Sequence, residues 1–230
     1  MKWNVSPALA VGGSAVAAFL VVSVLFGFTV VSIEEEEAAN VEFDAAVYVD
    51  AAWENIRTTI KDGAVDLAAI LREIEPDAEG RTAKENLAPV VEAYGRVTPG
   101  DAHVYEITTI GTVTDVDTAT SRGTLGLQVV GYEGPIEVRA YIGQRIPSDE
   151  TSVRDATGLI SFGDFRDQTE YGKVASEINK RVVADLSEVD AESLVGQEVQ
   201  ITGTLMMRTQ NLTQIPVGQL IVVPIEIVTP

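Results

Sequence analysis

The chain has 230 residues, of which 46% are hydrophobic, and it carries a formal net charge of −19. This length suits one membrane segment together with one or two small soluble units. The absence of cysteine excludes disulfides, thiol catalysis, a cysteine-based zinc site and a lipid-modified N-terminal cysteine. A single histidine, His103, argues against a catalytic triad or a multi-histidine metal site, and the acidic charge disfavours nucleic-acid binding.

Residues 8–33 form an uncharged run rich in Ala, Val, Leu, Phe and Gly. A helix needs about 20 apolar residues to cross a bilayer, whereas the apolar region of a secretory signal spans about 7–15 residues. We therefore expect an uncleaved single-pass anchor in the cell membrane, with cleavage after Ser32 as the alternative. Lys2 precedes the run and residues 34–37 are all glutamate, which places the rest of the chain outside the cytoplasm.

Helical spacing of apolar residues follows the acidic run. Residues 43–60 and 65–74 each carry apolar side chains on one helical face, and Trp53 is predicted to be a core anchor. A third helical stretch, residues 82–94, contains Pro89, which predicts a break or a kink there. These stretches indicate a short helical segment before the main domain.

From His103 onward the apolar spacing changes from helical to alternating, which indicates strands. We expect a helix over about residues 165–189, between the third and fourth strands. This order matches a five-stranded Greek-key barrel of the OB type, with an open sheet crossed by one helix as the alternative. Gly203 is one of four glycines expected at bends or bulges, the others being Gly111, Gly123 and Gly126. The five expected strands are residues 103–113, 124–132, 136–142, 198–207 and 219–228.

The predicted fold class is therefore α+β. It comprises an N-terminal transmembrane helix, a short helical segment, and a five-stranded OB-like barrel with a helix between strands 3 and 4. The expected parts are a cytoplasmic tip and anchor at residues 1–33, an acidic linker at 34–41, a helical segment packed on the barrel at 42–97, and the barrel domain at 98–230.

Residues 145–179 mix charged, aromatic and amide side chains more densely than any other segment. Arg154 and Asp155 lie in a predicted polar turn, where neighbours cannot easily pair with each other on one strand face. Guanidinium, amide and phenol groups around two phenylalanines suit a sugar or a peptide end. The alternative is a buried polar network that fixes the long crossover to the barrel. The candidate binding residues are Arg154, Asp155, Phe162, Phe165, Gln168, Tyr171 and Asn179.

The ordered run from Ser152 to Asn179, together with residues 196–199, Gly203 and residues 222–225, resembles the signature of an uncharacterised family of predicted bacterial periplasmic lipoproteins. The resemblance covers nearly all of the chain after the membrane run. Members are often encoded beside sugar ABC-transporter genes, which implies an accessory role in uptake. They typically carry a lipidated cysteine, so in this chain the apolar run would replace the lipid as anchor.

The leading functional hypothesis is a membrane-anchored, extracytoplasmic, non-catalytic module without cofactor or metal. Its partner is expected to be an ABC-transporter component or a small polar ligand. A first alternative is a structural subunit of an envelope complex with no ligand of its own. A second is a carboxylate-based hydrolase using Asp164 and Asp167, since a glycosidase needs two carboxylates about 5–10 Å apart. Acidic residues at a helix start also favour the helix dipole, which weakens that second alternative.

Overall fold

The computed structural model describes residues 43–230, and within them Asp44–Pro230 form one compact unit. The predicted membrane run, residues 8–33, and the acidic linker, residues 34–41, lie outside the described residues. Within the described part, no helix combines the length and the apolar character that crossing a membrane requires.

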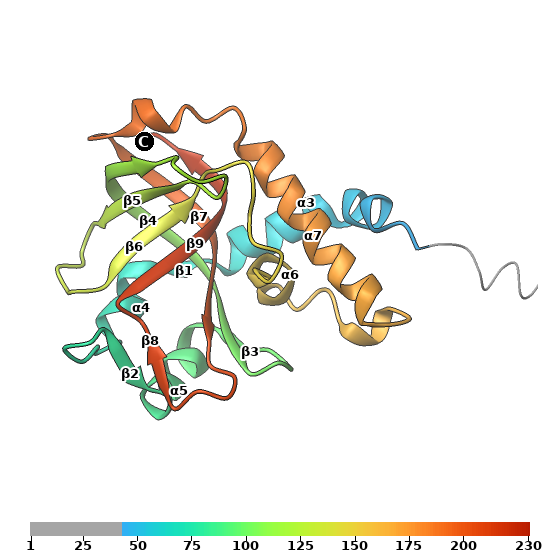
Figure 1. The fold of residues 1–230 in the computed structure, drawn as a ribbon, viewed down its shortest axis with the longest axis horizontal. Helices are drawn as coiled ribbons and strands as arrows, with labels where there is room; N and C mark the ends of the chain where they lie inside the picture. The colour runs from blue at the N-terminus through green and yellow to red at the C-terminus, as the bar shows by residue number, and fades with distance from the viewer. Residues whose placement is uncertain (1–42) are drawn as a thin grey trace, which may run out of the picture. The chain divides into compact units, whose positions relative to one another are not determined.

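The body of the unit is a sheet of mutually paired strands (Figure 1). Antiparallel pairing joins β4 to β5, β5 to β6, β9 to β7 and β7 back to β4, while β6 and β9 run parallel. This is the OB-type strand order that the sequence predicted. The main strands are β4 (Ala102–Asp117), β5 (Thr124–Val129), β6 (Glu137–Tyr141), β7 (Glu198–Arg208) and β9 (Gln219–Val228).

The long strand β4 also pairs with two short strands. The second half of β4 pairs with β5. The first half of β4 pairs along one edge with two short strands, β1 (Val65–Asp66), which runs parallel to it, and β3 (Arg96–Val97), which runs antiparallel. The sheet therefore has seven strands and is not the plain closed five-stranded barrel that was predicted. A separate ribbon of β2 (Arg81–Ala83) and β8 (Gln214–Pro216) was also not predicted, because such short strands leave no periodic pattern.

A glycine lies where β7 bends. The pairing of β7 with β9 shifts in register between Thr202 and Gly203, and a Cβ at Gly203 would collide with the backbone of Val223. The predicted role of Gly203 at a bulge is thus confirmed.

Within residues 43–230, three helices precede the long strands. Asp44 caps the first of them by accepting two backbone N–H groups. Pro89 lies inside the third helix, which continues past it, so of the predicted break or kink the break does not occur. The buried side chains of Leu87 and Val90, on either side of the proline, hold that helix against the core. The three helices are α3 (Ala45–Gly63), α4 (Leu67–Arg72) and α5 (Lys84–Tyr94).

The crossover from β6 to β7 contains the predicted helix between the third and fourth main strands, α7. Its apolar face, including Val174, Ile178 and Val182, is buried where α7 packs on α3 and β9 (Figure 1). The polar turn predicted around Arg154 is instead a short helix, α6, which corrects that prediction. The crossover elements are α6 (Ser152–Ala156), η1 (Phe162–Asp164), α7 (Gln168–Leu186) and η2 (Ala191–Leu194).

Trp53 fastens α3 to α7. Its side chain is buried, and its indole Nε1 donates to Oδ2 of Asp185 at 3.0 Å, across 132 positions of sequence. Arg57, one turn further along α3, donates to the same oxygen at 3.3 Å and lies 3.7 Å from Oε1 of Glu226 on β9. The predicted role of Trp53 as a core anchor is therefore confirmed, with α7 as its partner.

The substitution Trp53→Phe keeps an apolar ring but removes the indole donor. We expect it to lower the free energy of unfolding by about 1–3 kcal/mol, because a part-buried carboxylate loses a hydrogen bond. Urea unfolding followed by circular dichroism measures the change. Val47→Ala, at an exposed position of the same helix, is the matched control. A loss in Trp53→Phe no larger than in the control would contradict this role.

Candidate functional site

Arg154 and Asp155 are adjacent on α6 and form an ion pair. Nε of Arg154 donates to Oδ1 of Asp155 at 2.7 Å, and Nη2 donates to Oδ2 at 3.1 Å. Their side chains are 9% and 11% exposed. The expectation that these neighbours cannot pair is therefore wrong. It assumed an extended backbone, in which successive side chains point to opposite faces, whereas a helix lets the long arginine fold back on its neighbour.

Tyr171, near the start of α7, contacts the same ion pair. Its hydroxyl donates to Oδ1 of Asp155 at 3.1 Å, and its backbone carbonyl accepts from Nη1 of Arg154 at 3.1 Å. The guanidinium carbon lies 3.6 Å from the centroid of the tyrosine ring, which is a cation–π contact. Burial, and then the charge of Asp155, raises the pKa of the Tyr171 hydroxyl, so it stays protonated and donates at neutral pH.

Thr151 supplies a further hydrogen bond, in which its Oγ1 donates to Oδ2 of Asp155 at 2.7 Å. We call Thr151, Arg154, Asp155 and Tyr171 the Arg154 cluster. Asp155 accepts four hydrogen bonds within it, and a carboxylate offers about four acceptor positions. Among the described residues, Arg154 uses three of the five N–H groups of a guanidinium, so one remains on each terminal nitrogen.

Two phenylalanines surround the Tyr171 ring. The ring centroid of Phe162 lies 5.6 Å from that of Tyr171, and Phe165 lies 5.6 Å from Tyr171 and 5.4 Å from Tyr48 of α3. Phe165 is half-buried between these rings, whereas Phe162 is 52% exposed. An exposed aromatic ring next to a buried ion pair offers a ligand both apolar surface and hydrogen-bond donors.

The Arg154 cluster and Phe162 form one wall of a cleft of about 690 Å³, which we call the Arg154 cleft. Such a volume is typical of small-molecule sites. Its other walls come from the turn before β4, the end of β7 and the connection from β7 to β8. The cleft brings together five of the seven predicted residues, namely Arg154, Asp155, Phe162, Gln168 and Tyr171.

Several residues of this cleft escaped the sequence-based prediction. Arg208 ends β7, and its Nη2 donates to the backbone carbonyl of Asp149 at 2.8 Å, which ties the segment before α6 to the sheet. A charged residue at the end of a predicted strand was the available signal for Arg208. Met206 lies on β7, and the others lie in connections between elements, so they reach the cleft through tertiary packing, which the sequence does not reveal. The missed residues include Asp149, Thr151, Met206, Arg208, Gln210 and Leu212.

Asn179 does not line the Arg154 cleft. Its Nδ2 donates to the carbonyl oxygens of Glu150 at 2.8 Å and Pro147 at 3.2 Å, and the residue is buried. These bonds attach the segment that leads into α6 to the middle of α7. Phe165 is likewise not part of the cleft lining. The geometry of Asn179 is that of a structural link, which was the alternative interpretation of this stretch.

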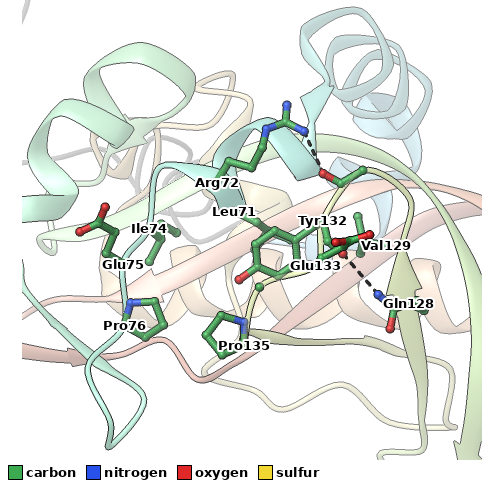
Figure 2. Close-up of a pocket in the computed structure, with 12 residues that line it drawn as sticks. Leu71, Arg72, Ile74, Glu75, Pro76, Gln128, Val129, Tyr132, Glu133 and Pro135 are labelled. Carbon is green, nitrogen blue, oxygen red and sulfur yellow. Dashed lines mark hydrogen bonds between the residues drawn. The ribbon is translucent and has the colours of Figure 1, made fainter.

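A second cleft, of about 840 Å³, lies between the connection after α4 and the turn from β5 to β6 (Figure 2). Pro76 and Pro135 line it together with the buried side chains of Leu71, on α4, and Ile74, just after that helix. Nη1 of Arg72 donates to the backbone carbonyl of Gly131 at 2.9 Å and so links the two sides. The charged residues that line this cleft are exposed, so it lacks the buried, oriented donors of the Arg154 cleft.

The two carboxylates considered for hydrolysis both serve helix starts. Asp164 accepts the backbone N–H of Ser161 in a capping box at η1. Asp167 caps α7 by accepting from Glu170 and Thr169, and the hydrogen bond from Glu170 contributes most to its lowered pKa. Neither lines the Arg154 cleft. In the described part of the chain, no cluster of three or more His, Asp or Glu side chains could hold a metal.

Asn179→Ala should lower the free energy of unfolding by about 1–3 kcal/mol, because it leaves the carbonyl oxygens of Pro147 and Glu150 without their donor. Gln168→Ala, at an exposed position of the same helix, should change it by no more than about 0.5 kcal/mol. Urea unfolding measures both variants. Equal effects in the two would show that the contacts of Asn179 do not stabilise the crossover.

Glu150 provides a pH-dependent test. Burial raises the pKa of its carboxyl, although the hydrogen bonds of Ser152 and the charge of Arg208 act against this. A raised pKa means that the folded state prefers the protonated form, so wild-type stability falls as the pH rises through the shifted pKa. Glu150→Gln removes this penalty. The variant should therefore gain stability over wild type at about pH 8, and the gain should shrink towards about pH 4. A difference in urea-unfolding free energy that is independent of pH would oppose this reading.

The crystal structure of an OB-fold protein from Thermotoga maritima is similar with a TM-score of 0.60 and 17% identity, covering 82% of this chain and 99% of that one. Such low identity shows the fold alone. Among proteins of curated function, no sequence matches this chain. The family model described as predicted periplasmic lipoprotein (DUF2291) matches residues 15–228, so the chain belongs to this family of predicted periplasmic lipoproteins.

Proposed function

We propose that the chain is a non-catalytic binding protein that acts outside the cytoplasm and takes a small polar ligand in the Arg154 cleft. Its family supports the extracytoplasmic, membrane-associated placement. The observation that supports a binding role is the Arg154 cluster. In it, the buried guanidinium of Arg154 lines a cleft and keeps two N–H groups that make no hydrogen bond within the described residues. A donor held by packing and hydrogen bonds suits recognition of a ligand. The capping roles of Asp164 and Asp167 weigh against the hydrolase alternative that relied on these two carboxylates.

The proposed anchor is a single membrane-spanning helix over residues 8–33. It would hold the folded unit at the outer side of the membrane in place of a lipid, because the chain contains no cysteine. The resemblance to lipoproteins encoded beside sugar ABC-transporter genes favours an accessory role in such an uptake system. In this form of the proposal, the Arg154 cleft faces the transported solute or a transporter component.

A structural role in an envelope complex is the second candidate. It is favoured by how firmly the crossover is fixed, through the bonds of Asn179 to the segment before α6 and of Asp185 to α3. Under this alternative the same contacts only hold a docking surface in shape. The cleft then takes no soluble ligand.

Thermal unfolding of the full chain in detergent, with a panel of sugars, amino acids and dipeptides, separates the two candidates. Binding to the folded state raises its stability by mass action, by about 2.7 kcal/mol when the ligand is at 100 times its Kd. At least one compound should raise the Tm of wild type. The rise should vanish in the double variant Phe162→Ala, Gln168→Ala. Val130→Ala, an exposed apolar position outside the cleft, should respond like wild type. No response in wild type favours the structural role.

A further inference from the structure

We infer, resting on the proposed function, that the ligand of the Arg154 cleft is a small molecule that carries a carboxylate on an apolar body. The recognising group is the guanidinium of Arg154. That residue is 8% exposed, and it is held by the carboxylate of Asp155 and by both the carbonyl and the ring of Tyr171. A guanidinium fixed in this way loses little conformational entropy when it binds a ligand.

In the ion pair at this wall, the spare hydrogen-bonding capacity lies with the guanidinium and not with the carboxylate. Two N–H groups of Arg154, one on each terminal nitrogen, have no partner among the described residues, while Asp155 already accepts four hydrogen bonds. A ligand carboxylate brings two acceptor oxygens and no donor, and its hydrogen bonds to a guanidinium are charge-assisted. A sugar hydroxyl offers one neutral oxygen, which cannot form the paired contact between opposite charges that a carboxylate forms with a guanidinium.

Other lining residues suit an apolar body. Phe162 and Leu212 are 52% and 43% exposed, and Pro99 and Met206 line the cleft with them. Covering these side chains removes apolar surface from water and needs no further polar partner. The cleft therefore combines a charge-assisted anchor with an apolar surface.

The charges of the cleft tolerate one negative group. The whole chain has a net charge of −19, but the cleft lining contains two arginines, Arg154 and Arg208, and two aspartates, Asp149 and Asp155. Asp155 is paired with Arg154, and the side chain of Asp149 is 77% exposed, where water and salt screen it. A ligand carboxylate thus enters a locally neutral cleft on an acidic protein.

The matched probes are N-acetyl-phenylalanine and its C-terminal amide, with glucose as a neutral sugar. In calorimetric titration of the full chain in detergent, the acid should bind at least about tenfold more tightly than the amide, which lacks the charge-assisted bonds. Arg154→Lys keeps the charge but removes the planar fork, and should bring the two probes within about threefold of each other. Arg122→Gln removes an exposed arginine outside the cleft and should keep the preference for the acid.

A measurement on wild type covers the case in which Arg154→Lys does not fold. In NMR spectra of arginine-labelled chain, the acid should shift the guanidinium resonances of Arg154 more than the amide does. Equal affinities for acid and amide, or a preference that survives unchanged in folded Arg154→Lys, overturn the inference. If glucose or another neutral compound binds and the acid does not, the proposed binding function stands and the carboxylate inference fails. If neither these probes nor the wider panel binds, both fail.

Discussion

The crossover depends on one buried ion pair, Arg154 with Asp155. Taking two charges out of water costs more than their attraction returns unless their remaining hydrogen-bonding capacity is met. The hydroxyl groups of Tyr171 and Thr151 donate hydrogen bonds to the carboxylate of Asp155. The backbone carbonyl of Tyr171 accepts one hydrogen bond from the guanidinium of Arg154. Because Tyr171 lies on α7 and the ion pair on α6, the pair is satisfied only when these helices have docked. The cleft wall thus exists only in the docked arrangement.

The helix that carries Tyr171 is itself attached at three levels. Tyr171 near its start binds α6, Asn179 in its middle binds the segment before α6, and Asp185 near its end binds Trp53 of α3. Each bond reaches a different part of the chain, so α7 cannot slide or rotate by a turn without leaving several buried or part-buried polar groups unpaired. This is how an OB-type sheet with a long crossover holds a side-chain cluster in a fixed place.

Secondary structure could be predicted from the sequence where a hydrophobic pattern extends over many residues. The strands predicted at residues 198–207 and 219–228 match β7 and β9 closely, because each carries ten or so residues of alternating or buried character. The prediction failed where a few residues take their conformation from packing. The α6 helix has five residues, and its buried face is defined by α7 and the sheet, so the pairing of Arg154 with Asp155 was misjudged. Arg208 could be placed at the end of a strand from the sequence, but its position beside the cleft follows from the pairing of β7 with β4.

An OB-type sheet does not specify what it binds, because unrelated functions share this fold and only the chemistry of a site distinguishes them. Here the distinguishing feature is a positively charged hydrogen-bond donor on a chain whose overall composition is acidic. The chain carries 35 acidic and 16 basic residues, yet at the Arg154 cluster the carboxylate of Asp155 is fully used while two N–H groups of Arg154 are spare. Repulsion by the net charge is long-range and fades over a screening length of about 8 Å at physiological salt. Hydrogen bonding to a fixed guanidinium acts only at contact, so an acidic surface can still select a negatively charged group at this one wall.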